Sequence, residues 1–161
     1  MAEPCPEELH FRKVCGIVWC YLRADFVREL PDDAIDHRAE FGARLPTLHS
    51  TMHLYPIDGA AHDVGQAETA FSYRDANWAQ VIVGVDPDPA NAGAIRQWTV
   101  DYWEATHPYS AGGAYINFLM NEGQDRVRAS YRDNYQRLTE VKTAYDPKNV
   151  FHVNQNIAPQ A

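Results

Sequence analysis

A tyrosine and an asparagine stand two residues apart in the otherwise apolar segment 115–118, which reads Tyr-Ile-Asn-Phe. The apolar residues predict a β-strand, and alternation along a strand places Tyr115 and Asn117 on the same face. A phenol and an amide side by side can hydrogen-bond the polar edge of a planar ligand. The alternative is a buried tyrosine whose hydroxyl is satisfied locally. The spacing makes Tyr115 and Asn117 candidates for a ligand site.

A run of amide side chains lies near the end of the chain. Residues 154–157 read Asn-Gln-Asn-Ile, and they follow the segment 145–151, which reads Tyr-Asp-Pro-Lys-Asn-Val-Phe. Three consecutive amides offer donors and acceptors to neutral polar atoms. The alternative is a capped end that faces solvent.

Two histidines four residues apart, His49 and His53, have the spacing of metal ligands on a helix. The residues around them predict a strand, and no Asp or Cys completes an obvious ligand set, so we expect no metal site. We expect instead that His49 or His53, with Tyr55, faces a substrate cavity. A serine hydrolase is rejected because the sequence has no Gly-x-Ser-x-Gly motif.

The order of these motifs resembles the C-terminal signature of the berberine bridge enzyme family of FAD-linked oxidases. The motifs are Tyr-Ile-Asn-Phe at 115–118, a charged helix, Tyr-Asp-Pro-Lys-Asn-Val-Phe at 145–151 and Asn-Gln-Asn-Ile at 154–157. The resemblance implies FAD as cofactor and hydride transfer from a substrate C–H bond to the flavin. It also implies a set of cofactor contacts, which are Tyr115, Asn117, Asn154 and Asn156.

The family often places a base at a second tyrosine of its Tyr-x-Asn-Tyr motif, and that position is Phe118 here. A phenyl ring neither donates nor accepts a proton, so the resemblance assigns no catalytic residue. The substrate contacts that we expect remain His49, His53 and Tyr55.

The resemblance covers residues 8–157 and corresponds to the C-terminal part of a family member. The family's main flavin-binding domain has no counterpart before residue 9, and Gly112-Gly113 is too short to serve as a dinucleotide fingerprint. We therefore expect a substrate-binding and flavin-covering portion of an FAD-dependent oxidoreductase that is inactive alone. Its expected partners are a small-molecule substrate and either a chain that bears the flavin domain or a second copy. The alternatives are a non-catalytic ligand- or protein-binding α+β module left from a truncated oxidase, or a remnant without function.

The length of the chain predicts a single domain over 1–161. The resemblance implies a substrate-binding-like sheet with helices in 8–112 and a berberine-bridge-type C-terminal segment in 113–158. We expect an α+β fold, an antiparallel sheet with helices packed on one face. No turn residues separate the first two strands, which suggests an internal deletion near 21–24. Trp98 recurs with its neighbours at helical spacing, so it is expected in the core. The predicted strands are 9–22, 23–30, 48–57, 69–74, 78–85 and one at Tyr115, and the predicted helices are 32–42, 86–106 and 125–144, the last broken near Asp133.

Composition and charge narrow the class of protein. The 161 residues are 45% hydrophobic and carry a formal net charge of −8, which argues against nucleic acid or an anionic membrane as partner. The arginines from Arg126 to Arg137 alternate with acids, which predicts a solvated helix face. The three cysteines cannot all pair within one chain, and Cys15 and Cys20 lie in an apolar run where thiols act as small hydrophobes. Neither a signal peptide nor a membrane span is recognisable, so we expect a cytoplasmic protein of bacterial type.

Overall fold

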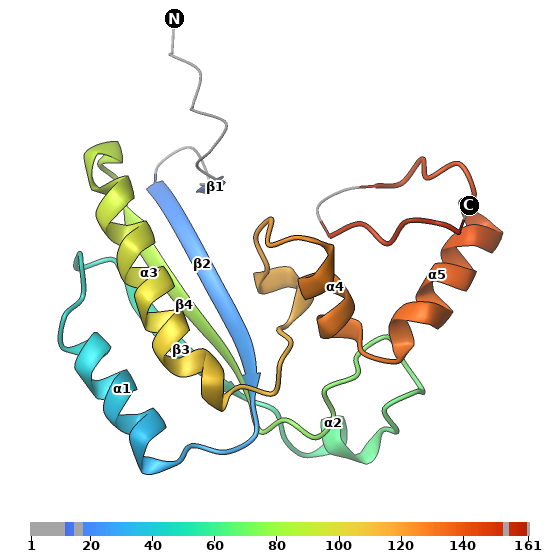
Figure 1. Ribbon diagram of the computed structural model, residues 1–161, viewed down its shortest axis with the longest axis horizontal. Coiled ribbons are helices and arrows are strands. Elements are labelled where there is room, and N and C mark those ends of the chain that lie inside the picture. Colours follow the sequence, from blue (N-terminus) through green and yellow to red (C-terminus); the bar gives the residue numbers. More distant parts are fainter. Residues whose placement is uncertain (1–11, 15–17, 153–154, 161) are drawn as a thin grey trace, which may run out of the picture.

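The computed structural model describes residues 12–14, 18–152 and 155–160. In Figure 1, α1 and α3 lie against one face of the sheet, whereas α4 and α5 lie beyond strand β2. The elements are β1 (Arg12–Val14), β2 (Val18–Val27), α1 (Asp32–Gly42), β3 (Thr51–Pro56), α2 (Ala60–Asp63), β4 (Trp78–Asp86), α3 (Ala92–Thr106), α4 (Gln124–Tyr131) and α5 (Asn134–Tyr145), with 3-10 turns η1 (Pro89–Asn91), η2 (His107–Tyr109) and η3 (Ile116–Phe118).

The strands form one antiparallel sheet in the order β1-β2-β4-β3. β4 lies between two partners, as its nearly continuous apolar sequence predicts, since both of its faces are covered. The register places Val81 between Ala24 of β2 and His53 of β3, so these three side chains share one face. Ile82 lies between Arg23 and Met52, and this row points to the other face.

Helices α1 and α3 cover the face that carries Ile82. Ile82 is buried against Trp98 and Tyr102 of α3, which confirms the predicted place of Trp98 in the core. Gly84 permits the close approach of α3, because a Cβ at this position would lie 2.6 Å from the Ile95 carbonyl oxygen. The fold is the α+β class expected from the sequence, with the helices α1 and α3 on one face of an antiparallel sheet.

The opposite face is partly covered by the segment 111–120, which runs along the edge of β2. The Phe26 amide donates to the Gly113 carbonyl, and the Ala111 amide donates to the Phe26 carbonyl, both at 2.7 Å. Ala114 and Leu119 then pack against Val81 of the central strand. The segment is therefore fastened to the sheet at its start and buried in part, at Gly113, Ala114, Leu119 and Met120.

The strand predicted at Tyr115 is wrong. Tyr115 has an extended backbone, but the Phe118 amide donates to the Tyr115 carbonyl at 2.8 Å and closes the 3-10 turn η3. Ile116 and Phe118 pack on the sheet as a cover. The alternating apolar residues that favoured a strand are explained by this packing.

The strand predicted at 69–74 is also wrong, because this stretch is a loop. Its polar backbone groups are satisfied by side chains from elsewhere. Asn134 donates to the Thr69 carbonyl at 3.0 Å, and Arg74 donates to the Phe71 carbonyl at 3.2 Å and the Ala61 carbonyl at 3.0 Å. The loop is tied to α5 and α2, and the sheet gains no strand from it.

The sheet is continuous where the sequence suggested a deletion. β2 runs without a break through residues 21–24, with Leu22 opposite Val83 and Ala24 opposite Val81. The strands predicted at 9–22 and 23–30 are instead the short β1 and the long β2. At ten residues, β2 is near the upper limit of ordinary strand length, and β4 supplies partners along it.

The remaining helix predictions are confirmed. The expected helix at 32–42 is α1, and the one at 86–106 begins with η1, where Asp88 accepts a hydrogen bond from the Ala90 amide at 2.9 Å, and continues as α3. The predicted break near Asp133 is present, because Arg132 has a φ of 48° between α4 and α5. In the part of the chain that the structure describes, no helix has the length and apolar character needed to cross a membrane.

Cys20 is buried in the sheet, and burial raises the pKa of its thiol to about 11. It therefore acts as the small hydrophobe that the sequence predicts. Cys5 and Cys15 lie outside the described residues.

Candidate functional site

Four aromatic side chains form a row across the sheet face opposite α1 and α3. The His53 and Tyr55 rings are stacked at 5.5 Å between centroids, Tyr55 lies 5.8 Å from Phe118, and Phe118 meets Tyr115 edge-on at 5.1 Å. We call these four residues the aromatic row. It joins an edge strand to the segment that covers the sheet, two parts of the chain that are distant in sequence.

The two pairs of rings in the aromatic row are brought together by different local structures. His53 and Tyr55 share a face because side chains alternate along β3. Tyr115 and Phe118 come together through the turn η3. The rings remain accessible, since Tyr55 is 46% exposed and Tyr115 is 37% exposed. Large exposed rings on an ordered surface are a feature of binding sites.

The expected pairing of Tyr115 with Asn117 is present. The Asn117 side-chain amide donates to the Tyr115 hydroxyl oxygen at 2.9 Å. This bond uses one amide hydrogen, which leaves the Asn117 oxygen, its second hydrogen and the Tyr115 hydroxyl hydrogen available to a ligand. The structure therefore brings the two residues together, although by a turn and not by strand alternation.

His49 does not join the row. It lies in an exposed position in the loop before β3. Within the described ranges it makes no ring contact or hydrogen bond, whereas His53 has its Nε2 atom 3.1 Å from the Thr51 hydroxyl. The structure separates the two histidines that the sequence treated alike.

The amide tail docks on the loop that follows the aromatic row. The Gln155 side chain donates to the carbonyls of Leu119 and Met120, the second at 3.2 Å, and Gln124 donates to the Asn156 carbonyl at 3.2 Å. Asn154 lies outside the described residues. Sequence reasoning did not single out Gln155 as an anchor, and only its place in the motif could have indicated this role.

A buried cluster of charges fastens α4 to β2. Asp25 is 1% exposed and accepts a hydrogen bond from Arg126 at 3.1 Å, and its other oxygen lies 3.0 Å from His107 Nδ1. Arg126 also donates to the Ala24 carbonyl at 2.7 Å and pairs with Glu122 at 3.3 Å. The predicted solvated face is therefore wrong for Arg126, because its guanidinium lies against the edge of β2.

Glu122 completes this cluster with a second ion pair to Arg23 at 3.3 Å. Burial raises the pKa of Glu122, and the two guanidinium groups oppose this shift only in part. Both guanidinium groups of this cluster are thus already paired with carboxylates. Among the residues that the structure describes, no group of three or more His, Cys, Asp or Glu side chains could hold a metal ion.

These residues suit the ring of a flavin. Aromatic faces favour stacking with a planar heterocycle, and the free amide atoms of Asn117 can bond its polar edge. Arg23 and Arg126 are paired with carboxylates and therefore offer no free positive charge to phosphates. The fit is therefore to the ring portion of the cofactor.

Comparison with known proteins shows which family the chain resembles. Residues 114–158 match the family model described as berberine and berberine-like. An uncharacterised FAD-linked oxidoreductase of Bacillus subtilis, YgaK, is 31% identical over 132 residues, which are 82% of this chain and 29% of that protein. Berberine bridge enzyme-like 9 of Arabidopsis thaliana is 26% identical over 157 residues, or 87% of this chain and 29% of that protein.

Solved structures show the same fold. Berberine bridge enzyme from Eschscholzia californica has a TM-score of 0.77 at 22% identity, over 89% of this chain and 34% of that one. The glycopeptide hexose oxidase DBV29, solved in complex with teicoplanin, has a TM-score of 0.75 at 24% identity, over 87% of this chain and 32% of that one.

The chain spans only about 30% of the length of the curated relatives that it matches. The family match lies at its C-terminal end, over the turn η3, both helices of the α4–α5 pair and the amide tail. The fold, the motifs and the relatives agree, and the chain is thus a member of the berberine-bridge-enzyme-like group of FAD-linked oxidoreductases, of which it carries the C-terminal region.

Proposed function

We propose that this chain forms the wall that covers the flavin ring of an FAD-dependent oxidoreductase and faces its substrate. The observation that carries the proposal is the aromatic row, which lies on the sheet face opposite the helices and ends at the bonded pair Tyr115 and Asn117. Its relatives are described as FAD-linked oxidoreductases. When bound, FAD would accept a hydride from a substrate C–H bond.

The row divides into a cofactor end and a substrate end in this proposal. In this proposal Tyr115 and Asn117 bond the polar edge of the flavin ring, and Asn156, whose backbone carbonyl accepts a hydrogen bond from Gln124, supplies a further amide. Asn154 is assigned to the same role by its place in the motif. His53 and Tyr55, exposed at the other end, contact the substrate.

Phe118 lies between the two ends and contributes an apolar surface. Its ring is 5.8 Å from Tyr55 and 5.1 Å from Tyr115, so it links the two ends without a group that moves a proton. The proton-accepting atoms within the row belong to the imidazole of His53 and the two phenols. Thr51 already engages His53 Nε2, which leaves Nδ1 for a substrate.

The phosphates of FAD require a second binding unit. The chain spans about 30% of the length of its relatives, and Arg126 and Arg23 are paired with Asp25 and Glu122. We propose that a flavin-holding unit, on the same polypeptide or on another, contacts this wall. The chain by itself would then cover the flavin ring without catalysing oxidation.

A flavin titration of the purified chain tests this function. We expect riboflavin and FAD to bind with micromolar affinity. Their dissociation constants should agree within about threefold, because the wall contacts the ring that both share. AMP, which has a phosphate and no flavin ring, serves as the matched control and should not compete. Fluorescence quenching reports binding. A folded, monodisperse chain that binds neither flavin contradicts the proposal.

The second candidate is a binding module without redox chemistry. Tyr145 and Phe151 are 86% and 78% exposed at the end of α5 and in the following loop, so apolar surface is accessible away from the row as well. Such surface favours association with a protein partner or with a second copy. Gel filtration in the presence and absence of riboflavin separates the two functions, because self-association that flavin does not alter favours the module.

A further inference from the structure

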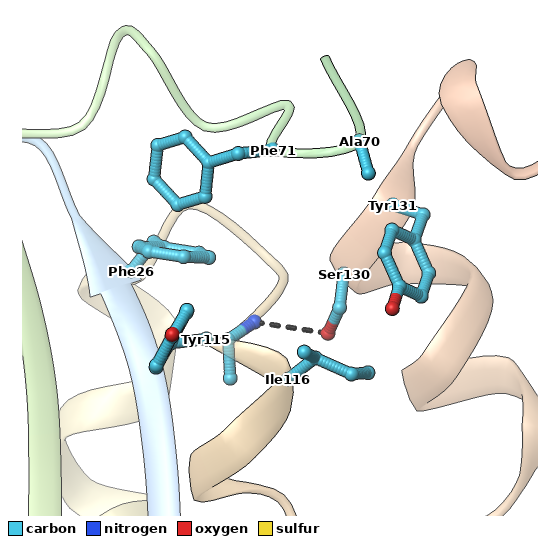
Figure 2. Close-up of a pocket in the computed structure, with 8 residues that line it drawn as sticks. Phe26, Ala70, Phe71, Tyr115, Ile116, Ser130 and Tyr131 are labelled. Carbon is cyan, nitrogen blue, oxygen red and sulfur yellow. Dashed lines mark hydrogen bonds between the residues drawn. The ribbon is translucent and has the colours of Figure 1, made fainter. Parts of the chain in front are cut away.

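A cavity of about 180 Å³ lies between the end of β2, the loop at 70–71 and α4. Figure 2 shows Phe26 and Phe71 on one side of it and Tyr131 on the other, with Ser130 and Ile116 between them. The cavity also borders Tyr115, which belongs to the aromatic row. It is a separate space beside the proposed flavin wall.

The walls of the cavity are rigid and aromatic. Phe26 and Phe71 meet edge-to-face, with ring centroids 5.5 Å apart and planes at 77°. Tyr73 stacks on Phe26 at 4.3 Å and therefore fixes the orientation of that ring. Among the described residues that line the cavity, none is charged. The space favours a neutral ligand, because a charge would lose its hydration without gaining a partner.

Among the polar side-chain atoms of Ser130 and Tyr131 at the cavity, the Tyr131 hydroxyl has unused hydrogen-bonding capacity. The Ser130 hydroxyl donates to the Arg126 carbonyl at 2.8 Å and accepts from the Ala114 amide at 3.2 Å, so it is satisfied. The Tyr131 hydroxyl has no hydrogen-bond partner within the part of the chain that is described. Burial raises the pKa of Tyr131, so this hydroxyl remains a protonated donor at neutral pH.

The volume restricts the size of the ligand. An engineered apolar cavity of about 150 Å³ binds benzene. A space of about 180 Å³ therefore holds one six-membered ring with a small substituent. The three fused rings of a flavin exceed this volume, which distinguishes the cavity from the surface that we assign to the cofactor.

We propose that this cavity binds a small, neutral, single-ring aromatic molecule with one hydrogen-bonding substituent, of which phenol is the simplest example. The ring packs against Phe26 and Phe71, and the substituent meets the Tyr131 hydroxyl. This site goes beyond the flavin-covering role, and its occupant would contact Tyr115, which lines the cavity. A ligand here would therefore support the position of Tyr115 in the aromatic row.

Titration of the 15N-labelled chain with phenol, benzene and cyclohexanol tests the proposal. We expect saturable changes in the amide signals of Ala114, Ile116 and Ser130 with phenol. Benzene should bind roughly 3- to 10-fold more weakly, because it lacks the hydrogen bond. Cyclohexanol, which has a hydroxyl but no aromatic ring, should bind more weakly than phenol. Equal affinity for all three compounds would identify a non-selective apolar space and overturn the proposal.

Two substitutions locate the site. Ala70→Trp at the exposed mouth should fill the cavity and abolish binding, whereas Ala67→Trp, on the same exposed loop but away from the cavity, should not. Tyr131→Phe should reduce the affinity for phenol to that for benzene. Absence of saturable shifts in the wild-type chain, or phenol binding that Ala70→Trp leaves unchanged in a folded variant, would overturn the proposal. The wild-type shifts decide the question even if a variant does not fold.

Discussion

The two faces of the same sheet have opposite characters. On the face covered by α1 and α3, Ile82 and Tyr102 are fully buried and Trp98 is 8% exposed. On the other face, Tyr55 and Tyr115 expose more than a third of their surface although they are ordered and in contact with neighbouring rings. Because side chains alternate along each strand, one sequence builds a buried, stabilising face and an exposed face, to which we assign ligand binding, at the same time.

The polar groups of the two sheet faces also differ, in how fully they are hydrogen-bonded within the protein. On the helix face, Arg38 donates to Gln80 at 2.5 Å, and Gln80 donates to Thr106 at 3.1 Å, all three being buried. Burial also raises the pKa of Tyr102 to about 12, and its hydroxyl donates to the Arg38 carbonyl at 3.2 Å. These groups are engaged with each other, whereas Asn117 retains free donor and acceptor atoms. Satisfied polar groups specify packing, and unsatisfied ones on a surface are available to a ligand.

Truncation of one side chain on each face should give the largest difference in the free energy of unfolding. Trp98→Ala removes a buried ring from the α3–sheet interface and should cost about 3–5 kcal/mol of unfolding free energy. Tyr55→Ala, on the open face, should cost less than about 1 kcal/mol and should weaken ligand binding instead. Urea denaturation measures both. A loss below 1 kcal/mol for Trp98→Ala would show that the helix packs differently.

A glycine pair tests the packing of α3 against β4. Gly84→Ala places a Cβ within 2.6 Å of the Ile95 carbonyl oxygen and should destabilise the protein by about 1–3 kcal/mol. Gly93→Ala is the matched control, since its Cβ meets nothing within 4 Å and alanine favours the helix. The melting temperature should therefore fall for Gly84→Ala and rise for Gly93→Ala. Equal shifts would contradict the close approach of α3.

The binding face should respond in affinity and not in stability. Asn117→Ala removes an exposed amide and should weaken riboflavin binding roughly 3- to 10-fold with little change in the melting temperature. Asn91→Ala, exposed at the start of α3 and without a side-chain capping bond, is the control and should leave the affinity unchanged. A large loss of stability with unchanged flavin affinity would assign Asn117 a structural role.

The smallest expected effect is a dependence of stability on pH through Glu122. Burial raises the pKa of this carboxyl in the folded state, so the folded protein retains the proton over a range in which the unfolded chain loses it. The contribution to stability is complete below the ordinary glutamate pKa and is lost as the pH rises through the raised value. Glu122→Gln should remove this pH dependence, which denaturation at a series of pH values measures. If the free energy of unfolding of Glu122→Gln falls with rising pH as it does in the wild type, the pH dependence belongs to another group.

Two kinds of sequence pattern predicted the fold well. The apolar run of β4 and the helical spacing of Trp98 both led to the observed elements, because each depends on neighbours a few residues away. The errors at Tyr115 and at 69–74 have one physical cause. Both stretches have strand-like composition, but their backbone bonds go to a turn in one case and to distant side chains such as Asn134 in the other.

The sequence by itself determined the family signature, the class of fold and the nearness of Tyr115 to Asn117, since all three depend on local order and periodicity. Only the tertiary structure decided that His53 and not His49 joins the aromatic row, that Arg126 is buried beside Asp25, and that Phe26 and Tyr131 enclose a cavity. Each of these depends on contacts between residues that are far apart in the chain. Such contacts are set by the packing of whole elements, which no local pattern records.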